Sequence, residues 1–417
     1  MSICKRFSWV VGLVVFTSQA WGQVASSPFS QYALGETYSN SLANTQGSAG
    51  LGVSLPQSWY INNQNPALLV YNTFASFQGG LLAEQKTISS SSASEKFKGG
   101  NMNYLVVAFP VKHNKLRNIW GTSLGLMPYS SSKYSFTNIR TIEGKSGTTV
   151  ENNSGTGGLT QLYWSNGVRI TPDFSLGLKS SYIFGSIDHT TEFITTQAPS
   201  IEKKAFMKGF KFDLGASYSK DSIGSKNYRV SVGAVYGIST NLRTFLSNIS
   251  SSTGAAIDST DGHTHLPSHI TGGISISRDG KWAIGTEYTY QDWSSFSTVA
   301  LQQNPTSLDS RLSKSWRFSF GGEFTPNVEA VEGIFKRMTY RLGVTAEQYP
   351  YTPLGSKVND LGANFGFSIP TGRSSIDLGF KVGKRGSKTE TVIQENYFKI
   401  YLGVTFNDIW FIKRKFD

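Results

Sequence analysis

The chain has 417 residues, a formal net charge of +12 at pH 7, 43 glycines, 13% aromatic residues and 16% charged residues. So many aromatic residues exclude a disordered chain, and charged residues are fewer than the roughly 25% of an average soluble domain. A basic chain can bind nucleic acid, but the sequence has no nucleic-acid-binding motif, so we expect no nucleic-acid partner. We attribute the positive charge to groups that face anionic lipid headgroups or line a lumen.

The N-terminus has the three parts of a secretory signal peptide. Lys5 and Arg6 form its basic region, Phe7–Phe16 forms its apolar core, and Ala20-Trp21-Gly22 supplies small residues before a cleavage point. The apolar core is shorter than the roughly 20 residues of a membrane-spanning helix. We therefore predict cleavage rather than an uncleaved anchor. The only cysteine, Cys4, would leave with the signal peptide, which fits an oxidising compartment.

Residues 23–73 form an irregular stretch before the regular part of the chain. They are rich in Gly, Ser, Asn and Gln and show no sustained hydrophobic period. Asn65-Pro66-Ala67 lies near the end of this stretch. An Asn side chain can hold a loop by bonding backbone groups, and Pro fixes a turn, so we expect an ordered turn here.

Alternation with a period of two dominates the rest of the chain. In Phe398–Asp408, for example, large apolar residues alternate with Lys, Tyr, Gly, Thr and Asn. Strands of roughly ten residues with one small, polar face are typical of outer-membrane barrels, whereas strands of soluble sandwiches usually have about five or six residues. The pattern predicts fourteen strands, near residues 74–85, 101–111, 117–127, 158–170, 173–187, 206–219, 226–238, 268–277, 281–292, 313–325, 337–347, 360–369, 373–384 and 396–409.

The links between these strands alternate in length. After the even-numbered strands they are mostly short and contain Pro, Gly or Asp, as in Thr171-Pro172 and Pro370-Thr371-Gly372. After the odd-numbered strands they are longer: 86–100, 128–157, 188–205, 239–267, 293–312, 348–359 and 385–395, of which 128–157 could also extend its flanking strands. Short periplasmic turns and long outer loops predict a barrel in the cell outer membrane with both termini in the periplasm.

Three stretches carry a family resemblance: Leu266-Pro267 followed by Lys281–Ile284 and Tyr288–Phe296, Trp316–Gly322 with Tyr340–Val344, and Asn65-Pro66-Ala67. On these residues the chain, over roughly residues 60–410 and mainly in its second half, resembles the FadL-type family of outer-membrane transporters for hydrophobic compounds. In addition, Ser27–Gly35 and Asn407–Lys415 resemble the two ends of Bacteroidota members of this family.

The resemblance implies a fold and a division of the chain. The expected fold is all-β, a 14-stranded antiparallel transmembrane β-barrel with an N-terminal plug, or hatch, inside the lumen. We assign residues 1–22 to the signal peptide, 23–73 to the plug, 74–411 to the barrel and 412–417 to a short basic tail in the periplasm.

The resemblance also implies passive passage of small hydrophobic compounds across the outer membrane, with Asn65, Pro66 and Ala67 in the gate. Loops 188–205 and 239–267 are polar, however, and only a short amphipathic turn around Phe245 and Leu246 could take an apolar ligand. The alternative is a scaffold or shuttle barrel that binds a secreted or outer-membrane protein, as in type IX secretion or an assembly accessory. The expected surroundings are the lipid bilayer and lipopolysaccharide.

His263, His265 and His269 are close in sequence, with Asp258 and Asp261 nearby. Such groups could bind a transition metal, but a solvated polar loop explains them more simply. We therefore expect no metal and no cofactor. The pair of acid and histidine in Asp261-Gly262-His263 would need a second acidic pair to act as a protease, so we expect no enzymatic activity.

Overall fold

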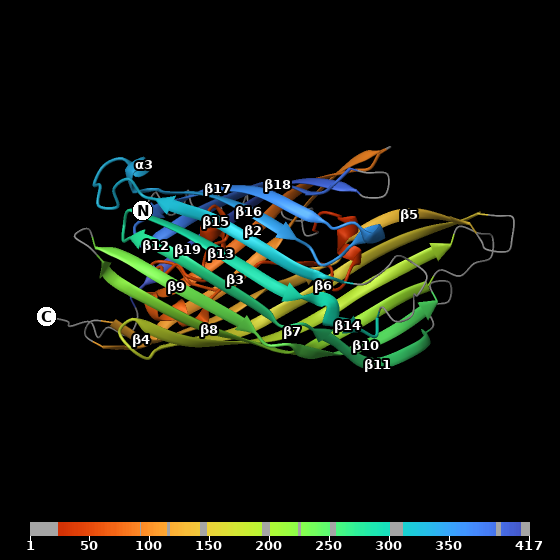
Figure 1. Cartoon of the computed structure of the whole chain (residues 1–417), viewed down its shortest axis with the longest axis horizontal. Coiled ribbons are helices and arrows are strands. Elements are labelled where there is room, and N and C mark those ends of the chain that lie inside the picture. The colour runs from red at the N-terminus through yellow and green to blue at the C-terminus, as the bar shows by residue number, and fades with distance from the viewer. Residues whose placement is uncertain are drawn as a thin grey trace, which may run out of the picture.

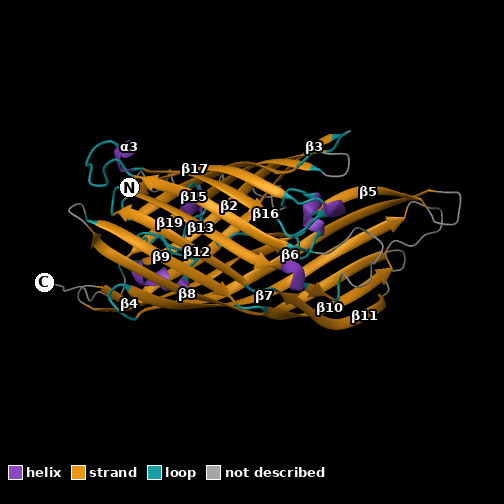
Figure 2. Ribbon diagram, in the orientation of Figure 1, coloured by secondary structure: helices purple, strands orange, loops and turns teal. Residues whose placement is uncertain are grey.

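The computed structural model describes residues 24–409 except 92, 115–116, 142–147, 194–200, 224–226, 251–255, 301–311 and 389–392. The predicted signal peptide and basic tail lie outside the described residues. The described strands form a single antiparallel sheet in which the last strand pairs with the first strand of the wall, Asp408 opposite Ala75. The sheet is therefore a closed barrel (Figures 1 and 2).

The wall is built of β2 (Ala75–Ser89), β3 (Ser94–Asn114), β4 (Arg117–Ser131), β5 (Tyr134–Thr141), β6 (Thr148–Arg169), β7 (Phe174–Phe193), β8 (Ile201–Ile223), β9 (Tyr228–Gly237), β10 (Thr240–Ser250), β11 (Ala256–Leu266), β12 (His269–Arg278), β13 (Trp282–Asp292), β14 (Ser297–Thr298), β15 (Lys314–Phe324), β16 (Thr339–Gln348), β17 (Asn359–Thr371), β18 (Ser374–Gly386) and β19 (Gln394–Asp408). Four pairs, β4 with β5, β9 with β10, β11 with β12 and β13 with β14, are each one strand with a break. Counting each pair once gives the fourteen antiparallel strands that the sequence predicts.

The long links were predicted less well than the strands. Within the expected loop 239–267 the chain forms β10 and β11, which pair with each other. Within 128–157, β5 and the first part of β6 extend the flanking strands, as the sequence allowed. These pieces are rich in Ser, Thr, Gly and Asp. Their backbone hydrogen bonds need no apolar face, so the hydrophobic alternation that predicts the other strands is weak here.

The two faces of the wall differ in polarity. Large apolar side chains point outward and are exposed, for example Leu342 (70%) and Leu361 (67%), whereas the charged side chains of Lys86, Lys179 and Asp377 are buried on the inward face. Exposed apolar area on this scale is costly in water at about 25 cal/mol per Å². A bilayer is the surrounding that removes this cost.

Few helices occur in the described chain: η2 (Pro28–Gln31), α2 (Ala43–Gln46), η3 (Pro66–Tyr71), η4 (Trp293–Ser295), α3 (Ile334–Arg337) and η5 (Pro353–Gly355). Among the described residues, no helix has the length and apolarity required to cross a membrane.

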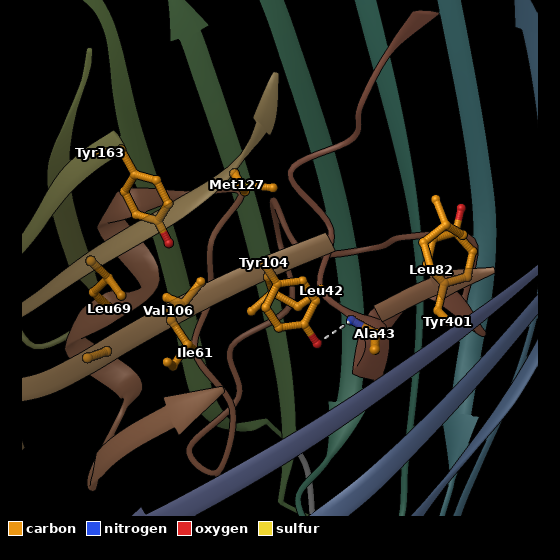
Figure 3. Close-up of a cluster of buried hydrophobic side chains, with 11 residues drawn as sticks. Leu42, Ala43, Ile61, Leu69, Leu82, Tyr104, Val106, Met127, Tyr163 and Tyr401 are labelled. Atoms are coloured by element: carbon orange, nitrogen blue, oxygen red, sulfur yellow. Dashed lines mark hydrogen bonds between the residues drawn. The ribbon is translucent and has the colours of Figure 1, made fainter. Parts of the chain in front are cut away.

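The N-terminal segment, residues 24–73, is enclosed by the strands. Leu42, Ala43, Ile61 and Leu69 of this segment pack on inward side chains of the wall in one buried cluster (Figure 3). The backbone N–H of Ala43 donates a hydrogen bond to the hydroxyl of Tyr104 on β3 at 3.0 Å. A two-residue strand, β1 (Glu36–Thr37), pairs with the end of β4. We call the end of the barrel near Ala75 and Asp408 the turn end and the opposite end, with the β10–β11 hairpin, the loop end.

Candidate functional site

The side chain of Asn65 joins two parts of the N-terminal segment to the wall. Its Oδ1 accepts a hydrogen bond from the N–H of Ala67 at 3.0 Å and so caps η3. Its Nδ2 donates to the carbonyl of Val53 at 2.8 Å and to that of Ala216 on β8 at 3.0 Å. Asn65 is fully buried. The ordered turn that the sequence predicts is therefore present, with Pro66 in its first helical turn.

A row of four glycines forms the surface on which η3 lies: Gly121, Gly167, Gly177 and Gly215, on β4, β6, β7 and β8. They are direct cross-strand neighbours. A Cβ at Gly177 would stand 2.4 Å from the backbone nitrogen of Ala67. At Gly121, Gly167 and Gly177 a side chain would meet the backbone of the helix, and at Gly215 it would meet the side chains of Asn65 and Pro66. Sequence reasoning missed this row, although a glycine at the same level of successive strands is a visible signal.

A single carboxylate holds the middle of the N-terminal segment. Glu287 on β13 is buried and accepts hydrogen bonds from the backbone N–H groups of Gly52 at 2.8 Å and Val53 at 2.6 Å. The hydroxyl of Ser275 on β12 donates to the carbonyl of Ser54 at 2.6 Å. Sequence reasoning also missed Glu287, although an acidic residue among the mostly small inward-facing residues of this strand is a visible signal.

A cluster of buried ions holds the first part of the segment. Glu36 accepts from Lys86 at 2.6 Å, from Arg385 at 3.0 Å and from Lys399 at 3.3 Å. The cations also approach further wall carboxylates, Glu84, Asp360 and Glu395. Burial alone would raise the pKa of Glu36, but Lys399, Lys86 and Arg385 hold that pKa well below its usual range. Glu36 therefore stays ionised and binds the segment to three strands.

Two cavities lie on either side of this segment. The inner cavity, of about 300 Å³, is lined by charged side chains, among them Arg317, Lys381 and Glu347, and by many aromatic ones: Tyr32, Tyr38, Trp293, Trp316, Tyr349, Tyr351, Tyr397 and Tyr401. Burial raises the pKa of Tyr32 to about 12, so its hydroxyl is neutral near pH 7.

The turn-end cavity, of about 720 Å³, is lined by Leu55–Tyr60, by the inward residues near the ends of the strands and by the turns between them. Gly50 and Val53 line the inner cavity, whereas Leu55 and Pro56 line the turn-end cavity. The short piece from Gly50 to Pro56, which Glu287 holds, therefore borders both cavities.

The prediction of an amphipathic turn around Phe245 and Leu246 is wrong, because both residues lie on strand β10. Their side chains point in opposite directions because successive residues of a strand alternate. Phe245 is exposed on the outer face, and Leu246 is buried in an apolar cluster with Leu34 of the N-terminal segment and Leu242. The structure does not bring this pair together with Asn65, which is bonded to another level of the wall.

The three histidines expected in one loop lie on strands. His263 and His265 are on β11, where His265 bonds Asn241 at 2.7 Å. His269 is on β12, lines the inner cavity, and has its Nε2 3.7 Å from Asp213. Within the described ranges, no group of three or more His, Cys, Asp or Glu side chains could hold a metal ion.

The chain belongs to the class of closed barrels of fourteen antiparallel strands with an apolar outer face, and it is similar in fold to solved FadL-type barrels. A FadL homologue from Pseudomonas aeruginosa is 12% identical with a TM-score of 0.59, covering 89% of this chain and 99% of that one. The toluene transporter TodX from P. putida is 15% identical with a TM-score of 0.57, covering 91% and 100%. The toluene transporter TbuX from Ralstonia pickettii is 14% identical with a TM-score of 0.55, covering 88% and 98%.

The BamG family model matches residues 3–417. The chain therefore belongs to the BamG family. No curated protein matches it.

Proposed function

We propose that this chain is an outer-membrane barrel through which small hydrophobic compounds pass passively, with residues 23–73 as a movable plug. The observation that carries the proposal is the pair of cavities lined by neighbouring residues of this segment, Gly50 and Val53 on one side and Leu55 and Pro56 on the other. Displacement of the segment at this point would join the two spaces. The similar structures include toluene transporters, which supports a hydrophobic and aromatic cargo.

The side chains along the route fit such a cargo. At the loop end, Leu246 and Leu34 belong to an apolar cluster inside the barrel. Next comes the tyrosine-rich lining of the inner cavity, where ring stacking and burial of apolar area would hold an aromatic compound. Asn65, Pro66 and Ala67 would fix the resting position of the plug. Passage involves no covalent step, so we expect no catalysis.

In this proposal the outward apolar band contacts lipid, the outer leaflet is lipopolysaccharide, and the turn end faces the periplasm together with both termini. The short links at the turn end and the long hairpins at the loop end support this orientation. The assignment to the Bacteroidota branch remains a prediction.

The test is uptake of radiolabelled toluene by whole cells that express the full chain in an outer membrane. We expect faster uptake than in cells without the chain, and a further increase for Glu287→Gln, which loosens Gly50–Pro56. Glu329→Gln, at an exposed position of the turn end, is the matched control. Equal uptake with and without a folded barrel would refute passage.

A second candidate is the scaffold barrel that holds a protein partner. It is favoured by the buried ion cluster around Glu36. Three cations on one carboxylate hold the segment firmly, as expected if it closes the barrel permanently. In that case Glu287→Gln leaves uptake unchanged, and a partner protein copurifies with the wild-type barrel in stoichiometric amount.

A further inference from the structure

Basic side chains outnumber acidic ones in the turn-end cavity. Six cations line it: Arg169, Arg229, Arg278, Lys281, Arg337 and Arg341. Only three carboxylates do so: Asp221, Asp279 and Glu323. The cavity therefore carries a net positive charge from its own lining.

Two of the arginines already use all three carboxylates. Arg229 forms ion pairs with Asp221 and, at 2.8 Å, with Asp279. Arg341 pairs with Glu323 at 3.0 Å. Among the described residues, no carboxylate oxygen lies within 4.0 Å of the other four cations, Arg169, Arg278, Lys281 and Arg337.

Two of these four cations are positioned without an acid. Arg169 donates hydrogen bonds to the carbonyls of Asn118 at 3.1 Å and Pro172 at 2.9 Å, and its guanidinium stands 4.6 Å from the centre of the Tyr71 ring. The Nε of Arg337 is buried and has no hydrogen-bond partner in the described part of the chain. A buried donor without an acceptor is costly, and an added carboxylate would satisfy it.

The link between β15 and β16 adds an apolar surface beside the cavity. This link, residues 325–338, which we call the lobe, contains α3 and is ordered by its own hydrogen bonds, such as Asn327 N–H to the carbonyl of Lys336 at 2.8 Å. Val331 is 93% exposed and Phe335 is 71% exposed. Val328 and Arg337 of the same lobe line the cavity. The apolar surface and the unpaired cations are therefore adjacent.

We propose that the turn-end cavity and the lobe together bind a segment of another protein that carries several carboxylates and at least one large apolar side chain. The carboxylates enter the cavity and pair with Arg278 and Arg337, and the apolar side chain covers Phe335. Charge complementarity identifies the occupant. The turn-end cavity is also one of the two spaces on the proposed route of passage, but binding of a peptide to it is measured without any transport step.

The position of the cations favours a protein over a lipid. The cavity is lined by inward-facing wall residues such as Ser277, Ser368 and Asn407, which lipid on the outer face cannot reach. A small inorganic anion would pair with the cations but would leave Phe335 and Val331 in water. A peptide segment can satisfy both parts at once.

The test uses the purified full chain in detergent and a short fluorescein-labelled peptide of alternating glutamate and phenylalanine, followed by fluorescence anisotropy. We expect binding that weakens as salt rises. Arg278→Gln combined with Arg337→Gln should weaken binding roughly tenfold, because charge-assisted hydrogen bonds are lost. Phe335→Ser should weaken it several-fold, and Arg278→Lys with Arg337→Lys should retain most of the affinity.

Controls come from the loop end. Arg243→Gln and Ile139→Ser remove an exposed cation and an exposed apolar side chain there, and should change nothing. A peptide with glutamine in place of glutamate should bind at least tenfold more weakly. The proposal is overturned if the glutamine peptide binds equally well, or if the double variant with glutamine at Arg278 and Arg337 binds as tightly as both the lysine double variant and wild type. It is also overturned if Phe335→Ser affects only binding to phosphatidylglycerol vesicles, which would make the lobe a membrane contact. None of these measurements depends on toluene uptake.

Discussion

The N-terminal segment is fastened to the barrel in two different ways along its length. Its first part is held by ions: Glu36 lies among three cations, and Ser27 donates to Glu395 at 2.5 Å. Its later part is held by backbone groups, through Glu287, Asn65 and the row of glycines under η3. The cluster around Glu36 responds to pH, whereas the close packing of η3 on the glycine row, which involves no ionisable group, does not. One segment therefore has a part that responds to pH and a part that does not.

The largest effect is expected where the ionic part is broken. Glu36→Gln leaves Lys86, Arg385 and Lys399 without their shared carboxylate, and removal of one partner from a buried ion pair typically costs about 3–5 kcal/mol. We expect residues 24–40 to detach while the wall stays folded. Limited proteolysis of the purified barrel would show new cleavage in this stretch. Protection equal to wild type would show that the ions do not hold the segment.

The backbone-held part is broken most directly by adding a side chain to its surface. Gly177→Ala places a Cβ against the backbone of Ala67, and overpacking of this kind costs about 1–3 kcal/mol. The matched control is Gly272→Ala on β12, where a Cβ meets nothing within 4 Å. Thermal unfolding should separate the two variants. Equal melting temperatures would mean that η3 is not packed on the wall as described.

Glu287→Gln tests the same part through charge rather than volume. Glutamine keeps an acceptor but loses the negative charge, so each of its two short hydrogen bonds weakens, by about 2 kcal/mol in total. Hydrogen exchange at the amides of Gly52 and Val53 should accelerate, while amides of residues 24–40 stay protected. Acceleration in both parts would show that the two fastenings are coupled.

Asn65→Ala removes a helix cap and two further hydrogen bonds, and the cap alone is worth about 1 kcal/mol. We expect altered passage with little loss of folded barrel. Toluene uptake checks the altered passage, and the melting temperature of the same preparations checks that the barrel stays folded. A variant that fails to insert would show that the residue is required for folding.

The smallest effect is expected from mild acid, and only in the ionic part. The pKa of Glu36 is depressed in the folded chain. Its contribution to the stability of the folded segment is therefore complete above the usual carboxylate pKa of roughly 4.3, and it is lost as pH falls from there through the folded pKa. Proteolysis near pH 4 should show slight loosening of residues 24–40 and none around Ala67, where η3 packs on the uncharged glycine row. Equal loosening of both parts would contradict the distinction.

The fold was predictable because a barrel in a bilayer needs a regular period. Alternation such as that in Phe398–Asp408 repeats along most of the strands, and the number of strands follows from counting. The strands of the β10–β11 hairpin could not be predicted in this way, because polar residues dominate them and the few apolar residues of β10, such as Phe245 and Leu246, do not alternate with polar ones. The turn at Asn65-Pro66-Ala67 was predictable because the chemistry of Asn and Pro is local.

The remaining parts of the site depend on contacts distant in sequence. Glu36 and Arg385 are 349 residues apart, and neither residue type alone indicates an ion pair. Phe245 and Leu246 show the limit of a local pattern: their neighbours suggest an amphipathic turn, but strand pairing places them on opposite faces of the wall. The glycine row becomes meaningful only when four strands are placed in register.

The pairing of β19 with β2 determines the order in which this molecule can be assembled. One edge of β2, Ala75–Ser89, pairs with β3, but its other edge must wait for the last strand, Gln394–Asp408. By then the N-terminal segment has long been synthesised, and folded chains do not thread loops through closed rings. We therefore expect the segment to be in place inside the curving sheet before the ring closes, so that the last strand seals it in.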